Sequence, residues 1–310
     1  MFQRRTSLAA LAGLAALPVA FGGISLRANA AQVRTLLDSL RPSPRMPVMF
    51  VGHGSPMNAI EDNLWRRSWQ QVGQELSARS VQPQLILCIS AHWLTKDGWY
   101  LTGMSDPRTI HDFSGFPREL HEQQYPAPGA PAVARALAGE LRSPADRQPL
   151  KVDEGEWGLD HGTWSVLKPI FPKAQIPVIQ LSMDYARSPE AHFALGRQLG
   201  ALRERGVLIV GSGNAVHNLR RTKRGSAPNE AYDWATEFDE QVQGYIKRGE
   251  LESLVQFQKQ GELARLAHPT HEHYLPLLYA AGAASAREMP RFFNTGFQSA
   301  SISMRSVIWG

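Results

Sequence analysis

The sequence predicts an α/β fold: a single domain with a central, mostly parallel or mixed sheet that is flanked by helices. Apolar runs such as QLILCISA (84–91) and GVLIVGSG (206–213) are too continuous for half-exposed strands, and they indicate strands covered on both faces. Segments with helical spacing alternate with these runs. The 310 residues contain no internal repeat and no clear linker, which indicates one domain.

The first part of the chain predicts three buried strands and one helix. Three prolines end an N-terminal lead-in, and MPVMFVG (46–52) then has the apolar run of a short strand. A helix is expected over about 63–76. QLILCISA (84–91) and WYLTGM (99–104) follow as the next two strands.

The middle of the chain predicts a long loop, three helices and a strand. Aromatic, proline and glycine residues over 107–129 indicate a structured loop. Helices are expected over 132–141 and from about Gly162 onward, and IPVIQLSM (176–183) is a further buried strand. Residues 188–206 have a serine N-cap, an acidic first turn and a closing glycine, which are helix signals.

The last part of the chain predicts a strand that runs into a glycine turn at 206–213, and then amphipathic helices over 230–247 and 272–283. The imperfect alternation of SISMRSVIW (301–309) indicates a terminal strand. Open α/β sheets bind ligands at the carboxyl ends of their strands. Polar residues directly after the strands are therefore candidates for a functional site.

Composition excludes several classes of function. The net charge of +5 and the hydrophobic content of 43% are those of an ordinary soluble globular domain. The one basic cluster, Arg220, Arg221, Lys223 and Arg224, has no accompanying aromatic pattern, so we interpret it as a solvated face and expect no nucleic-acid partner. Cys88 is the only cysteine, so an intrachain disulfide is impossible, and its apolar run indicates a buried thiol.

Residues 1–30 have the pattern of a twin-arginine signal peptide. Arg4 and Arg5 precede an apolar stretch over 8–24, and small residues at 28–30 resemble a cleavage site. Glycines and a proline make the apolar stretch a poor membrane span, so no stable membrane anchoring is expected. This pattern predicts a periplasmic protein with a mature domain over 31–310. The alternative is a cytosolic protein with a chance basic, alanine-rich tail.

Four histidines stand at the ends of predicted elements. His53, His92 and His217 follow strands, and His273 stands at the start of a helix in THEHYLPL. Each alone could be a turn or core histidine. Because imidazole is the commonest protein ligand for zinc, iron and copper, their joint placement at one sheet edge predicts a single metal centre.

Two further pairs are candidates for other roles. Asp160 and His161 in GLDHGTW join a carboxylate to an imidazole, a combination suited to general acid–base catalysis. His111 and Asp112 in TIHDFSGFP could line a substrate pocket or merely stabilise the loop.

The chain as a whole resembles the class III extradiol ring-cleavage dioxygenases, in particular the DOPA 4,5-dioxygenase-like branch. The resemblance covers about residues 45–310. The motifs that carry it are collinear: GHGSPMNAIEDN, SAHW, TIHDFSGFP, YPAPG, DHGTWSVL, GSGNAVHNL and HYLPLLYAAG.

The resemblance implies a mononuclear metal site at His53, His92, His217 and His273, with Glu272 as a possible ligand that would complete a triad of two histidines and a carboxylate. It implies Fe(II) for turnover, although Zn(II) could occupy the same histidines without redox chemistry.

The resemblance also implies the substrates and the remaining roles. They are a catechol and O₂, with a muconic semialdehyde-type product. His161, oriented by Asp160, is the first candidate for the acid–base residue, and His217 is the other candidate if it lies outside the metal's ligands. His111 and Tyr125 are expected to bind substrate.

Two other functions remain compatible with a histidine-rich site of this kind. One is a zinc-dependent hydrolase that uses a metal-activated water. The other is a non-catalytic metal-binding protein on the same fold, since a fold does not determine a function. The sequence carries no signal for the oligomeric state or for the identity of the catechol.

Overall fold

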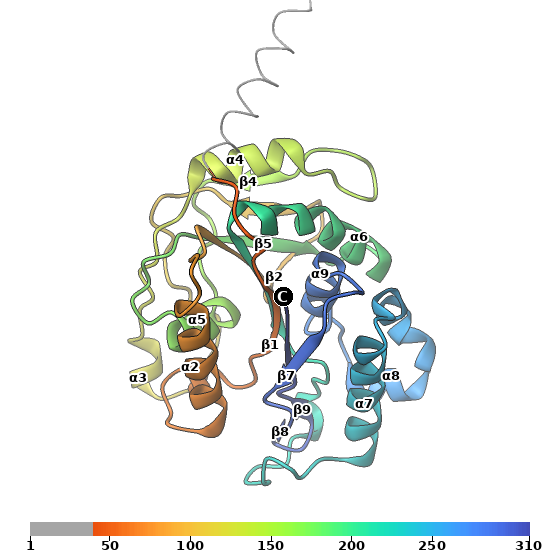
Figure 1. The fold of residues 1–310 in the computed structure, drawn as a ribbon. Helices are drawn as coiled ribbons and strands as arrows, with labels where there is room; N and C mark the ends of the chain where they lie inside the picture. The colour runs from red at the N-terminus through yellow and green to blue at the C-terminus, as the bar shows by residue number, and fades with distance from the viewer. Residues whose placement is uncertain (1–39) are drawn as a thin grey trace, which may run out of the picture.

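The structure is a computed structural model that describes residues 40–310. An eight-stranded sheet lies between two layers of helices, as Figure 1 shows. This confirms the predicted single α/β domain with a mixed sheet. The predicted signal peptide lies outside the described residues.

The sheet has parallel strands at its centre and antiparallel strands toward its edges. Its order is β4-β3-β5-β2-β6-β1-β10-β7. The central strands β5, β2, β6 and β1 are parallel, whereas β3 and β10 run antiparallel to their inner neighbours. The strands are β1 (Val48–Gly52), β2 (Leu85–Thr95), β3 (Tyr100–Thr102), β4 (Lys151–Asp153), β5 (Val178–Asp184), β6 (Val207–Gly213), β7 (Pro290–Phe293) and β10 (Ser306–Trp309); a small separate hairpin joins β8 (Phe297–Gln298) and β9 (Ile302–Ser303).

Helices cover both faces of the sheet. One face packs against α2 (Leu64–Ser77) and α5 (His161–Ile170), with the short α3 (Arg118–His121) nearby. The other face packs against α4 (Pro131–Glu140), α6 (Pro189–Leu199), α7 (Asp233–Lys247), α8 (Glu262–Ala267) and α9 (Leu275–Ala283). Short 3₁₀ turns complete the list: η1 (Pro56–Ala59), η2 (Gly200–Arg205), η3 (Leu219–Arg221) and η4 (Leu251–Gln260).

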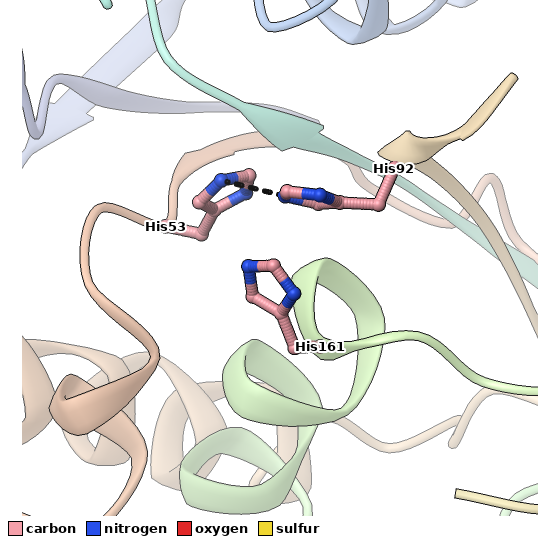
Figure 2. A group of neighbouring side chains, drawn as sticks. All are labelled: His53, His92 and His161. Carbon is pink, nitrogen blue, oxygen red and sulfur yellow. Dashed lines mark hydrogen bonds between the residues drawn. The ribbon is translucent and has the colours of Figure 1, made fainter. Parts of the chain in front are cut away.

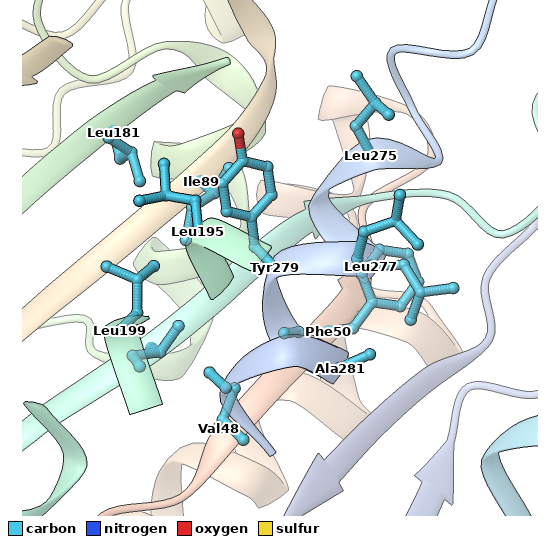
Figure 3. Packing of buried hydrophobic residues seen from close by; sticks show 14 of the residues in the cluster. Val48, Phe50, Ile89, Leu181, Leu195, Leu199, Leu275, Leu277, Tyr279 and Ala281 are labelled. Atoms are coloured by element: carbon cyan, nitrogen blue, oxygen red, sulfur yellow. The ribbon is translucent and has the colours of Figure 1, made fainter. Parts of the chain in front are cut away.

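The central strands divide their side chains between two cores. Val48 and Phe50 of β1 join the core under α6 and α9, while Met49 and Val51 join the core under α2 and α5. This is the period of two expected of a strand. Because both faces are covered, these strands are apolar throughout, which is why their sequence runs are continuous. Figure 3 shows α9 lying across the first of these cores.

Helix α9 lies unusually close to the middle of the sheet because β6 carries glycines beneath it. A Cβ at Gly211 would lie 2.4 Å from the carbonyl oxygen of Pro276, and one at Gly213 would lie 2.2 Å from that of His273. The backbone N–H of Asn214 donates to the same His273 oxygen at 2.8 Å. This close approach fixes His273 beside the carboxyl end of β6.

Several boundaries differ from those predicted. Strand β2 continues to Thr95, so His92 lies within it, and the β2–β5 register shifts between Ile89 and Leu94. Such irregularities redirect side chains. The predicted helix 188–206 ends as a 3₁₀ turn, and the predicted strand 301–309 is broken into β9 and β10. Within residues 40–310, no helix is both long and apolar enough to cross a membrane.

Candidate metal centre and active site

A cavity of about 740 Å³ opens at the carboxyl ends of the central parallel strands. Histidines from five separate segments share its wall, together with apolar side chains. The lining residues are His53, Gly54, Ser55, Pro56, Met57, Glu61, His92, Phe113, Phe116, His161, His217, Leu219, Thr222, Arg224, His273, Gln298, Ser299 and Ile302. The structure thus brings together all four of the histidines predicted as ligands.

His53, His92 and His161 form one cluster, shown in Figure 2, whose candidate ligand atoms lie within 4.8 Å of one another. The Nε2 atoms of His53 and His92 are 3.5 Å apart. The rings of His92 and His161 are closer still, with centroids 3.8 Å apart. As the first residue of α5, His161 lies beside two of the predicted ligands, His53 and His92. Its role outside the metal's ligands stays a prediction.

His217, His273 and Glu272 form a second cluster, and its two histidines line the same cavity. The rings of His217 and His273 are stacked, with centroids 3.5 Å apart and an 8° angle between their planes. The His273 ring centroid lies 5.2 Å from that of His53 and 5.0 Å from that of His92, so the two clusters share one site.

Asp112 is the carboxylate that contacts the first cluster. Its Oδ2 lies 2.9 Å from Nδ1 of His161 and 3.3 Å from Nδ1 of His92. The N–H of the His161 ring is not aligned for a hydrogen bond there, but Asp112 Oδ1 accepts one from the His161 backbone N–H at 2.9 Å. Burial alone would raise the pKa of Asp112, yet the contacts with His161 and His92 lower it to about 2.

The Asp160 side chain, which was predicted to orient His161, is bonded to groups other than the His161 ring. The Asp160 carboxylate caps helix α5 by accepting from the backbone N–H of Thr163 at 3.1 Å, and it also accepts from the side-chain amide of Gln180. It is fully buried, and burial raises the pKa of this carboxyl to about 6. Asp160 therefore holds the start of the helix that carries His161, while Asp112 contacts the ring itself.

His111 and Tyr125, which were predicted to contact substrate, do not line the cavity. Nε2 of His111 contacts the carbonyl oxygen of Gln123 at 2.9 Å, and the buried Tyr125 hydroxyl donates to Phe171 at 3.2 Å. These two contacts stabilise the loop: the one from His111 lies within the loop, and the one from Tyr125 ties the loop to the end of α5. The same loop instead turns Phe113 and Phe116 into the cavity.

The partners of three of the histidine rings assign the ring hydrogen to Nδ1. Ser212 donates its single hydroxyl hydrogen to the Gly162 carbonyl, so at 3.0 Å it can only accept from Nδ1 of His53. Nδ1 of His92 faces the Asp112 carboxylate, and Nδ1 of His273 faces Glu272 Oε1 at 3.0 Å. In all three rings Nδ1 carries the hydrogen and Nε2 is a lone-pair donor.

This donor set fits a metal ion. The Nε2 atoms of His53 and His92 face each other 3.5 Å apart. With the ring hydrogens assigned to Nδ1, two lone pairs would meet there, an arrangement that a cation between them stabilises. Two nitrogens bound about 2.1 Å from one tetrahedral metal would be about 3.4 Å apart. A second-sphere partner on the distal nitrogen is the usual arrangement of metal-bound histidine.

Burial and mutual repulsion keep these imidazoles neutral. Desolvation, followed by the neighbouring histidines, lowers the pKa of His53 and of His273 well below the usual value. The same causes lower the pKa of His92. The Asp112 carboxylate acts in the opposite direction but does not offset them. Burial and His161 lower the pKa of His217 to about 4. Neutral imidazole is the form that binds metals, so the site is ready for a cation at neutral pH.

Comparison with known proteins supports the same reading. Residues 47–307 match the family described as the catalytic LigB subunit of aromatic ring-opening dioxygenase. The chain belongs to the LigB family. It is therefore an extradiol ring-cleaving dioxygenase, which decides against the zinc-dependent hydrolase and the non-catalytic metal-binding protein.

Named relatives of this LigB-family enzyme lie in bacteria and plants. It is 46% identical over 273 residues to an Escherichia coli K12 protein named 4,5-DOPA dioxygenase extradiol, covering 87% of this chain and 97% of that one. A Beta vulgaris protein of the same name is 34% identical over 261 residues, covering 83% and 94%. The crystal structure of an uncharacterized E. coli K12 protein superposes with a TM-score of 0.72 at 42% identity, over 86% of this chain and all of that one.

The predicted signal peptide and periplasmic location are corrected by these comparisons. The family match begins at residue 47, and the E. coli relative is matched over 97% of its own length but 87% of this chain, so the comparisons give the predicted signal peptide no support. The comparisons support the dioxygenase domain and do not support an exported protein.

Proposed function

We propose that this LigB-family enzyme opens the ring of a DOPA-like catechol with O₂, at a metal held by His53, His92, His217 and His273, to give a muconic semialdehyde-type product. The observation that carries the proposal is the pair of Nε2 atoms of His53 and His92, which face each other 3.5 Å apart in the cavity. The names of the E. coli and plant relatives support the choice of substrate.

Fe(II), when bound, would supply the redox chemistry that the reaction of O₂ with a catechol requires. Zn(II) would fit the same histidines but has no redox chemistry, so a zinc-loaded enzyme is expected to be inactive in ring opening. Glu272 is better suited to orient His273 than to bind metal, because its Oε1 already contacts His273 Nδ1 and the Thr270 hydroxyl, each at 3.0 Å.

His161 is proposed as the acid–base residue. With Asp112 against Nδ1, the free Nε2 of His161 can accept the proton of a catechol hydroxyl and later return it. The Asp112 carboxylate stabilises the imidazolium that forms in between. His217 is the second candidate for this role if it lies outside the metal's ligands.

The apolar part of the cavity suits an aromatic ring. Met57, Phe113 and Phe116 line it on the side of the His53 turn and the long loop. Their side chains would exclude water from the ring and limit its orientation, so that the hydroxyl groups face the histidines. Reactants held in this way react as if in an intramolecular step.

The test is a comparison of two metal-loaded forms. Metal-depleted enzyme is loaded anaerobically with Fe(II) or with Zn(II), mixed with L-DOPA, and exposed to O₂ while O₂ uptake and yellow product are recorded. We expect one O₂ consumed per catechol with Fe(II) and none with Zn(II). The absence of catechol-dependent O₂ uptake in the Fe(II) form, across a panel of catechols, would overturn the proposal.

A further inference from the structure

Two charged side chains stand in the wall of the active-site cavity. Glu61 and Arg224 are the only Asp, Glu, Lys or Arg residues among the described residues that line it. Glu61 follows the turn after His53, and Arg224 lies in the loop after η3. Both are exposed. The rest of the wall is histidine, uncharged polar groups and apolar side chains.

Neither charged side chain has an oppositely charged partner within the described part of the fold. The adjacent residues are paired: Asp62 binds Arg67 at 2.6 Å, and Lys223 forms an ion pair with Glu230. Among residues 40–310, by contrast, the side chains of Glu61 and Arg224 form no ion pair, either with each other or with another residue. The cavity wall therefore carries two opposite charges that form no ion pair with each other.

The backbone that carries each charge is held in place. The N–H of Glu61 donates to the Met57 carbonyl at 2.9 Å, and the N–H of Lys223 donates to the Ser299 carbonyl at 2.9 Å. Gln298, the neighbour of Ser299, accepts from the Ser55 backbone N–H at 2.7 Å. This link joins the segment of His53 and Glu61 to the segment that anchors the backbone before Arg224, so both side chains project from backbone that is tied to the metal end of the cavity.

We propose that Glu61 and Arg224 form a subsite for the zwitterionic side chain of an amino-acid catechol. Arg224 would bind the carboxylate and Glu61 the ammonium group, while the ring lies along the apolar wall and its hydroxyls reach the histidines. A planar guanidinium is the preferred partner of a carboxylate. The inference rests on the proposed function, which it deepens by assigning the residues that select the substrate's side chain.

The size and chemistry of the cavity agree with this assignment. Its volume of about 740 Å³ leaves room beyond a single catechol ring. Exposed charges at a rim have a modest effect because water and salt screen them. The subsite is therefore expected to set substrate preference through KM and to leave the chemical step nearly unchanged.

The test uses four catechols whose side chains carry both charges, an ammonium alone, a carboxylate alone or no charge: L-DOPA, dopamine, 3-(3,4-dihydroxyphenyl)propionate and 4-ethylcatechol. The Fe(II)-loaded variants are Arg224→Met and Glu61→Gln. Arg221→Met and Asp62→Asn are the matched controls, because these neighbouring charges do not line the cavity. KM and kcat come from O₂ uptake, and affinity for L-DOPA is measured separately by anaerobic calorimetry.

We expect Arg224→Met to raise KM about tenfold for the two carboxylates, L-DOPA and the propionate, and to leave dopamine and 4-ethylcatechol unchanged. Glu61→Gln should do the same for the two amines, L-DOPA and dopamine. The control variants should resemble the wild type.

The outcomes separate the two proposals. Wild-type enzyme that opens the rings of all four catechols with the same KM would overturn the subsite and leave the ring-opening proposal standing. A KM change in Arg224→Met that is equal for charged and uncharged catechols would also overturn it. Wild-type enzyme that opens none of them would overturn the proposed function itself.

Discussion

Asp112→Asn is the substitution that most sharply tests how the histidines are arranged. Asp112 contacts two imidazoles through Oδ2 and the His161 backbone N–H through Oδ1. An asparagine can keep the backbone bond with its own Oδ1, but it then presents an NH₂ group to the two Nδ1–H groups. The two rings would have to change tautomer, which moves the hydrogen onto Nε2 and removes the lone pair.

The magnitude follows from those contacts. A carboxylate 2.9 Å from Nδ1 of His161 stabilises its imidazolium. At an effective dielectric of about 20 the Coulomb attraction at this distance is roughly 6 kcal/mol, which exceeds the usual worth of a positioned proton-transfer group. The loss in kcat is therefore limited by that worth, and it should be about 10²- to 10⁴-fold. For His92, the loss of a carboxylate on the distal nitrogen should weaken metal binding about 10- to 100-fold.

The assay separates the two effects. Metal affinity is measured by competition with a chelator, and kcat is measured by O₂ uptake at saturating Fe(II) and L-DOPA. Asp106→Asn is the matched control, because Asp106 is an exposed carboxylate that begins the same loop and contacts only Ser105 among the described residues. An Asp112→Asn enzyme with metal affinity and kcat both within about twofold of the control would refute this account of the site.

Three further predictions follow from the same structure. His53→Ala and His92→Ala should each remove most of the bound metal, measured by elemental analysis of the purified protein, and full occupancy in both variants would show that the site is elsewhere. His161→Phe should keep its metal but lose about 10²–10⁴-fold in kcat; loss of the metal would make His161 a ligand, and an unchanged kcat would pass its role to His217. His268, whose pKa burial lowers to about 3, is neutral in the folded state, so its contribution to stability is present above about pH 6.5 and is lost as the pH falls toward 3. Urea unfolding of the metal-free protein at pH 7 and pH 5 should therefore show a smaller pH-dependent loss for His268→Phe than for wild type, and an equal or larger loss would contradict the assignment.

The elements that form the core could be predicted from sequence because their pattern is local. The continuous apolar runs of β1, β2, β5 and β6 follow directly from cover on both faces, and all four strands begin near the predicted residues, although β2 continues beyond its predicted end. The convergence of His53, His92, His217 and His273 followed from the rule that places sites at strand ends.

The errors concern contacts that no local pattern encodes. Asp112 meets His92 and His161 only because a long loop folds back over the end of β2, whereas Asp160 is next to His161 in sequence but turns inward to cap α5. The irregular register of β2, which carries His92, has no marker such as glycine within LILCISAHWLT. The roles of Glu61 and Arg224 likewise appear only once the cavity is formed.

The central claim is that one metal ion lies between the Nε2 atoms of His53 and His92, with His273 and His217 completing its ligands. The most direct measurement is a crystal structure of the Fe(II)-loaded enzyme, grown anaerobically, with an anomalous difference map recorded at the iron absorption edge. We predict a single peak per chain, about 2.0–2.2 Å from both Nε2 atoms. A peak that contacts neither histidine, or the absence of a peak in a fully loaded sample, would contradict the account.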